Sequence, residues 1–179
     1  MARLFDQIAQ ALAVFAANDV SPALIGGLAL AAHDVVRATQ DVDFLIHAAD
    51  ADRTHDILLG LGYRCIHRSE DAANYVRNDE GLDLLYAHRP IALQLLDQAA
   101  ERDTPMGHLR VISAEGLIAF KLQGFVNDPA RTRDLDDIRS LLQVKGPALD
   151  MDEVARYFRL FDRQALLDEL IADTARPAR

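Results

Sequence analysis

The sequence predicts an α+β fold in which a mixed β-sheet is flanked by helices and followed by a helical C-terminal part. Short apolar runs with strand patterns fall in the first two thirds of the chain, and apolar residues at helical spacing fill the last third. The length of 179 residues suits one well-buried core. We therefore expect one compact unit, with the sheet in residues 1–112 and the helical part in 113–179.

The first half of the chain alternates helices and strands. Apolar spacing predicts a helix over 3–18, and a short apolar run at 23–25 predicts a buried strand that enters a turn at two glycines. A helix pattern follows at 28–36. The clearest strand is 41–46, whose apolar character on both faces predicts a central position in the sheet. The other expected elements are a helix over 52–61, strands over 63–66, 74–77 and 82–87, and a turn at 79–81.

The second half becomes helical after one more strand. Residues 91–102 have a helical pattern, and a short strand is expected at 109–112. Ser113 is a suitable N-cap for a helix over 114–125. After a break at 127–129 the chain is helical throughout. The remaining helices are predicted over 132–142, 151–161 and 164–172.

Composition excludes several classes of function. The formal net charge is −9, which argues against an unaided grip on a nucleic-acid backbone, because binding phosphates requires clustered Lys and Arg. The single cysteine, Cys65, can form no internal disulfide and supplies too little for a zinc site. No apolar run approaches the ~20 residues of a membrane span. We expect a cytoplasmic protein with no membrane partner.

Pairs of aspartates with one residue between them occur four times, at 41/43, 50/52, 134/136 and 150/152. Two of the pairs stand at expected helix starts, where carboxylates cap free N–H groups, and one lies inside a helix, where its members cannot share a face. Asp41 and Asp43 instead lie in a strand, so both project to one side with Cα atoms roughly 6.5 Å apart. Such carboxylates repel unless a cation joins them, and a few oxygen ligands suit Mg²⁺ or Mn²⁺. The structural alternative is two exposed aspartates at the beginning of a strand.

Two further features favour phosphate chemistry beside that pair. Glycine at Gly26 and Gly27 lets backbone N–H groups approach a phosphate where a strand turns into a helix, although a plain tight turn fits the same residues. Asp83 falls in a strand pattern of its own. Phosphoryl transfer needs such a carboxylate near the metal, either as a ligand or as a base for the attacking hydroxyl.

These motifs together resemble a known superfamily. The order Gly26-Gly27, then Arg37-x-Thr39-x-Asp41-x-Asp43, then Asp83 resembles the DNA polymerase β-like nucleotidyltransferases. The later run EGLIAFKLQGFVNDPARTRDLDDIRSLL is similar to the lysine and arginine-aspartate segments of AbiEii-type nucleotidyltransferases, which include toxins of toxin-antitoxin systems. The resemblance covers roughly residues 23–142 and implies a nucleotidyltransferase fold.

The resemblance implies a role for each acid and glycine. Gly26 and Gly27 would cradle the nucleotide phosphates. Asp41 and Asp43 would hold the metal ions, and Asp83 would be the third, base-like carboxylate beside them, which is also a candidate metal ligand.

It also implies nucleotide-binding positions outside the acids. Lys121 would contact the triphosphate, and Asp134 would match the acid of the arginine-aspartate segment. Arg37 and Thr39 would orient the loop before the acidic strand. From the residues alone, a surface lysine is the alternative for Lys121. The family's more common Gly-Ser pair is Gly-Gly here, so Gly27 lacks a hydroxyl contact to phosphate.

The expected reaction transfers a nucleoside monophosphate from an NTP to an acceptor hydroxyl with Mg²⁺ or Mn²⁺ and releases pyrophosphate. The acceptor stays open between an RNA such as tRNA, a protein, and a small molecule such as an antibiotic. As a toxin, the protein would have a cognate antitoxin as partner. A non-catalytic nucleotide-sensing or partner-binding module with the same fold is the alternative.

Overall fold

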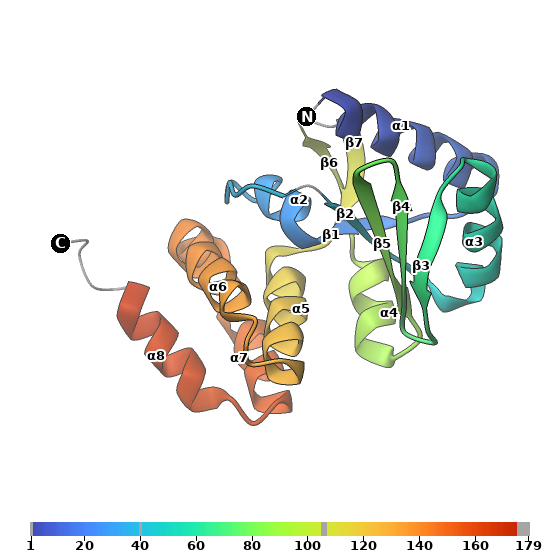
Figure 1. The fold of residues 1–179 in the computed structure, drawn as a ribbon. Helices are drawn as coiled ribbons and strands as arrows, with labels where there is room; N and C mark the ends of the chain where they lie inside the picture. The colour runs from blue at the N-terminus through green and yellow to red at the C-terminus, as the bar shows by residue number, and fades with distance from the viewer. Residues whose placement is uncertain (1, 40, 105–106, 175–179) are drawn as a thin grey trace. The chain divides into compact units, whose positions relative to one another are not determined.

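A computed structural model of the chain describes residues 2–39, 41–104 and 107–174 (Figure 1). The chain divides into two compact units, of which the first comprises residues 1–32 and 37–113 and the second comprises residues 33–36 and 114–179. Among the helices of the described ranges, none combines the length and the apolarity needed to cross a membrane.

The first unit is built on a seven-stranded mixed sheet in the order β3-β4-β5-β2-β1-β7-β6. The strand β2 lies at its centre, as the apolar faces of that segment predict, and pairs in parallel with β5 and antiparallel with β1. The mixed sheet and the helices beside it confirm the predicted α+β class. The strands are β1 Ala23–Ile25, β2 Asp41–His47, β3 Arg64–Arg68, β4 Ala72–Arg77, β5 Glu80–Ala87, β6 Ala100–Thr104 and β7 Gly107–Val111.

Helices cover one face of this sheet and leave acids on the other. Figure 1 shows α1 (Ala2–Ala17) and α3 (Ala51–Gly60) side by side. The ring of Phe15 on α1 meets the ring of Phe44 on β2 edge to face, with centroids 6.3 Å apart. Phe44 alternates with Asp43, so burial of the phenyl ring turns the aspartate to the opposite face. Two shorter helices complete the unit, α2 (Gly26–Ala31) and α4 (Pro90–Asp97).

One predicted helix is wrong at its C-terminal end. The helix expected over 91–102 ends at Asp97, and Ala100–Thr104 forms the edge strand β6 instead. Every residue of β6 pairs antiparallel with β7, and four of its five side chains are exposed. An exposed edge strand carries no apolar alternation, so the tertiary pairing with β7 decides its structure.

Two smaller differences concern turns. The helix expected over 28–36 is α2, which ends at Ala31, and Asp34 adopts a left-handed φ of 66° beyond it. The three-residue turn expected at 79–81 is a two-residue turn at 78–79, because Arg77 pairs with Glu80.

The second unit is helical, as predicted. It contains α5 (Ala114–Asn127), α6 (Thr132–Lys145), the 3₁₀ turn η2 (Gly146–Ala148), α7 (Met151–Leu160) and α8 (Gln164–Thr174).

The two aspartate pairs expected to cap helices behave differently. The Asp150 carboxylate accepts the backbone N–H groups of Asp152 and Glu153, each at 3.0 Å, so capping is confirmed for α7. Asp50 stands at the N-cap of α3 but makes no side-chain cap bond, and Asp52 pairs with Arg68. The pair does stand at the start of α3 as expected, but capping by the Asp50 side chain is wrong, because its carboxylate lies 3.4 Å from Nη2 of Arg53 and bonds no backbone N–H group.

Candidate active site

Three carboxylates gather on one face of the central strands. Asp43 on β2 lies directly opposite Asp83 on the parallel strand β5, and Asp41 lies opposite Gly81 in the same ladder. Residues paired across a ladder project to the same face, and residues two apart on a strand do so too. Asp41 is exposed, whereas Asp43 and Asp83 are half-buried. The sheet thus brings together the three acids that the sequence predicts.

Two glycines make room for the carboxylates on β2. A β-carbon at Gly26 would collide with Oδ2 of Asp43, and one at Gly81 would collide with Oδ1 of Asp41. Gly26 also has a φ of +67°, which L side chains rarely adopt. Because β1 and β5 flank β2 on opposite sides, the two carboxyl groups lean toward opposite neighbours. Residue 26 therefore has to be glycine, both because of its left-handed backbone conformation and because the Asp43 carboxylate occupies the space of a β-carbon.

The electrostatic environment of Asp83 differs from that of an exposed aspartate. Burial raises the pKa of its carboxyl, a hydrogen bond from the Asn74 side chain lowers that pKa, and the charge of Asp41 raises it, with a net shift upward. Asn74 lies opposite Asp83 in the β4–β5 ladder. Asp83 is thus held by a neutral partner and repelled by an acid.

The loop before β2 packs against the second glycine. A β-carbon at Gly27 would lie 2.9 Å from Cβ of Thr39, 3.0 Å from its hydroxyl oxygen and 3.0 Å from Nη2 of Arg37. The Thr39 hydroxyl donates to the backbone carbonyl of Asp41 at 3.3 Å. The predicted nucleotide-binding residues Gly27, Arg37 and Thr39 therefore meet beside the acids.

Lys121 and Asp134 belong to the second unit. The Lys121 side chain is buried, and its Nζ lies 2.9 Å from Oδ1 of Asp134 and 2.8 Å from Oδ2 of Asp137. Asp134 also accepts from Nε of Arg131 at 2.7 Å. The surface position considered for Lys121 is thus wrong, because α5 packs on α6 and the two carboxylates enclose the ammonium.

Three residues of these clusters were missed by the sequence motifs. A two-residue turn at 78–79 would have placed Asn74 opposite Asp83, and Gly81 follows from the register of β5 with β2, which sets it opposite Asp41. Asp137 stands three residues after Asp134 on α6, on the same side of that helix.

The donor chemistry of the acids suits a hard divalent cation. Mg²⁺ commonly binds one or two protein carboxylates and completes its coordination with water and phosphate oxygens. Asp41 and Asp43 can supply those carboxylates. Within the described ranges, no group of three or more His, Cys, Asp or Glu side chains stands in a metal-binding arrangement. The repulsion between Asp41 and Asp83 is one that a cation would relieve.

Comparison of the sequence with protein families gives one match over nearly the whole chain. The profile of a family described as "Uncharacterised nucleotidyltransferase" matches residues 2–172. Among curated proteins, no sequence matches the chain.

Several solved structures share the fold. The solution structure of the antibiotic-resistance factor ANT(2″)-Ia superposes with a TM-score of 0.68 at 19% identity, covering 94% of this chain and 96% of that one. The lincosamide antibiotic adenylyltransferase LnuA, bound to lincomycin, gives a TM-score of 0.56 at 16% identity, covering 78% and 96%. An antigenic nucleotidyltransferase-like protein from Paracoccidioides brasiliensis gives 0.57 at 17%, covering 95% and 93%. At these identities the likeness concerns the fold.

Proposed function

Because the chain belongs to the family of uncharacterised nucleotidyltransferases, we propose that it transfers a nucleoside monophosphate from an NTP to a hydroxyl group of a small-molecule acceptor. The observation that carries the proposal is the register of β2 and β5, which sets Asp43 opposite Asp83 with Asp41 on the same face. A structural role would not require three acids side by side, since their mutual repulsion costs stability.

The phosphate-binding half of the site consists of the glycine pair and the loop before β2. Gly26 and Gly27 present backbone without side chains next to the acids, and Arg37 brings a positive charge to the same place. Asp41 and Asp43, with Asp83 beside them, would hold Mg²⁺ or Mn²⁺. When bound, that ion supplies Lewis-acid stabilisation of the negative charge on the phosphates.

Asp83 is the proposed base. Its pKa is raised chiefly by burial, which brings a carboxyl closer to the range where it can take a proton from a hydroxyl. The acceptor hydroxyl gives its proton to Asp83 while its oxygen attacks the α-phosphorus. The bond from that phosphorus to the bridging oxygen breaks, and pyrophosphate leaves with the electron pair. Asn74 orients the carboxylate by its hydrogen bond.

Lys121 and Asp134 are two further proposed nucleotide-binding residues. The ammonium of Lys121 already contacts two carboxylates, those of Asp134 and Asp137. A contact with the triphosphate would exchange one of these carboxylates for a phosphate oxygen.

Two observations support a small molecule as acceptor. One structural neighbour is the lincosamide antibiotic adenylyltransferase LnuA, and another, ANT(2″)-Ia, was solved with adenylyl-2″-tobramycin; this chain covers 98% of that second neighbour. The net charge of −9 disfavours binding to an RNA backbone. The AbiEii-type toxin role, with an RNA or protein acceptor and a cognate antitoxin, is the other candidate suggested by sequence resemblance.

The test is a labelling reaction. The protein is incubated with each α-labelled NTP, Mg²⁺ or Mn²⁺, and a cell extract separated into small-molecule, RNA and protein fractions. We expect label in the small-molecule fraction, and none with Asp43→Asn. Label in the RNA or protein fraction would mean that the acceptor is an RNA or a protein and not a small molecule. Tight NTP binding without any product would support the non-catalytic module.

A further inference from the structure

The position that a β-carbon of residue 27 would take is crowded by another part of the chain. Thr39 and Arg37 approach the place where a side chain at Gly27 would begin, with the Thr39 hydroxyl oxygen 3.0 Å from it. Gly27 is buried and Thr39 is half-buried. Glycine at residue 27 therefore leaves room for the hydroxyl group of Thr39, which stands twelve residues further along the chain.

A hydroxyl at this place has a chemical use if the site binds an NTP. The helix α2 has six residues, so few peptide dipoles add up at its start, and phosphate binding depends on individual donors. A serine at residue 27 would place its oxygen one bond beyond the β-carbon. The Thr39 hydroxyl oxygen lies 3.0 Å from that β-carbon position, in the same neighbourhood.

The present hydrogen bond of Thr39 is one that a phosphate can replace. Its hydroxyl donates to the Asp41 carbonyl at 3.3 Å, which is long for a bond between oxygens. A bond to an anionic phosphate oxygen is shorter and stronger. Arg37 lies beside it, with Nη2 3.0 Å from the same β-carbon position, so charge and hydroxyl approach together.

We propose that Thr39 supplies the phosphate-binding hydroxyl that Gly27 lacks, so that the loop before β2 takes over the task of a serine in the glycine turn. The inference rests on the proposed function, since it concerns how that site holds the β- and γ-phosphates of its NTP. It assigns Thr39 a direct contact with substrate in addition to its place in the loop.

The test moves the hydroxyl from one residue to the other. Four variants are compared by calorimetric titration with an NTP and with the matching nucleoside monophosphate, both with Mg²⁺: Thr39→Val, Thr39→Ser, Thr39→Gly, and the double variant Gly27→Ser with Thr39→Gly. Thr39→Val should lose about ten- to a hundredfold in NTP affinity, the range of one hydrogen bond to a charged group, and nothing in monophosphate affinity. Thr39→Ser keeps the hydroxyl and should bind as the wild type does.

The double variant is the decisive arm. Thr39→Gly removes both the Cβ at 2.9 Å and the hydroxyl oxygen at 3.0 Å from the β-carbon position of residue 27, so with Gly27→Ser the NTP affinity should recover from the level of Thr39→Gly toward that of the wild type. Thermal melting supplies a check that needs no ligand. Gly27→Ser should lower the melting temperature more in the wild type than in Thr39→Gly, because the two side chains compete for one space.

The outcomes separate this inference from the proposed function. Wild-type protein that binds no NTP would overturn both. Wild-type binding that Thr39→Val leaves unchanged would overturn the inference alone. So would equal losses for NTP and monophosphate, or a double variant that melts normally and stays weak, since Thr39 would then only hold the loop.

Discussion

The carboxylate of Asp43 lies in the space that a β-carbon at Gly26 would occupy. Gly26→Ala should therefore displace a catalytic carboxylate and strain a backbone with φ +67° at a cost of about 1–2 kcal/mol. We expect transfer activity to fall about a hundredfold, the effect of misplacing a reacting group by an ångström. Steady-state kinetics of monophosphate transfer measures the loss.

Gly60→Ala is the matched control for that variant. Gly60 ends α3, and a β-carbon there meets nothing within 4 Å. Its activity should equal that of the wild type. Equal activity in Gly26→Ala as well would show that Asp43 needs no fixed position.

The ionised carboxylate of Asp83 should lower the stability of the folded protein. Its folded-state pKa is raised, chiefly by burial, above the value of about 3.9 in an unfolded chain. The folded protein therefore holds this proton more tightly, so stability falls as the pH rises through the folded-state pKa. Asp83→Asn removes that penalty and should melt at a higher temperature than the wild type at pH 7. The difference should vanish at a pH below the unfolded-state value.

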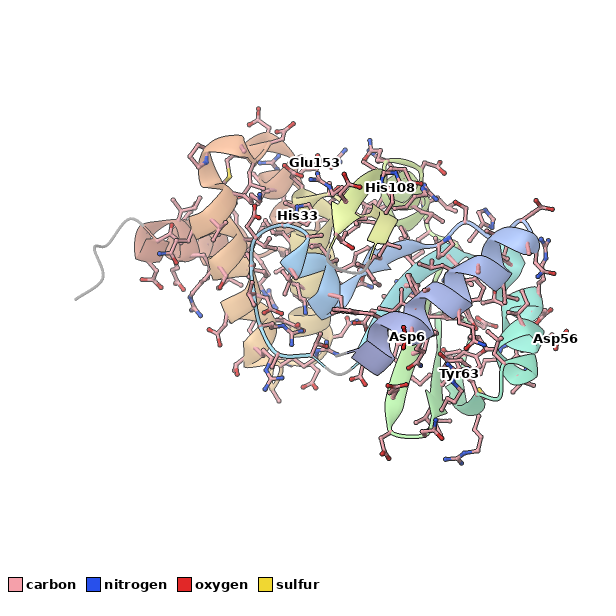
Figure 2. All side chains as sticks on the ribbon, turned by 90° about the horizontal axis from the view of Figure 1, so that it is seen from above. Asp6, His33, Asp56, Tyr63, His108 and Glu153 are labelled. Atoms are coloured by element: carbon pink, nitrogen blue, oxygen red, sulfur yellow. The ribbon has the colours of Figure 1, made fainter. Side chains whose placement is uncertain are left out.

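The control for Asp83→Asn is Asp56→Asn. Asp56 is exposed and points outward from α3 (Figure 2). Its replacement should leave the melting temperature unchanged at both pH values. A lower melting temperature for Asp83→Asn at pH 7 would mean that the ionised carboxylate stabilises the fold, contrary to its burial beside Asp41.

Lys121 should be essential for the stability of the helical unit. Lys121→Ala leaves the buried carboxylates of Asp134 and Asp137 without their shared cation, and breaking such a buried pair costs about 3–5 kcal/mol. Urea unfolding followed by circular dichroism measures the loss. Arg139→Ala removes an exposed pair with Asp136 and should cost about 0–1 kcal/mol.

The same variant also tests the proposed nucleotide contact of Lys121. NTP affinity is measured at a temperature where Lys121→Ala is fully folded. A loss of affinity there supports a contact with the triphosphate. Unchanged affinity together with the loss of stability would limit Lys121 to a structural role.

Local patterns predict most of the sheet and its acids. Asp41 and Asp43 begin a strand with apolar character on both faces, and such a strand belongs at the centre of a sheet, where β2 lies. What local patterns miss depends on partners distant in sequence. The strand β6 has exposed side chains and exists through its pairing with β7.

The gaps in the predicted site have the same cause. Asn74 meets Asp83 in the register set by the two-residue turn at 78–79, whereas a three-residue turn at 79–81 would pair Asn74 with Tyr86, on the opposite face of β5. The partners of Lys121 depend on how α5 packs against α6, which helical spacing leaves undetermined.

The central claim is that the acids of β2 and β5 hold a metal-bound NTP for transfer. Calorimetric titration of each NTP, with and without Mg²⁺ or Mn²⁺, tests it most directly in the wild type, Asp43→Asn and the control Asp56→Asn. We predict metal-dependent binding in the wild type and the control, and its loss in Asp43→Asn with the fold intact by circular dichroism. Wild-type affinity in Asp43→Asn would contradict the assignment of the site.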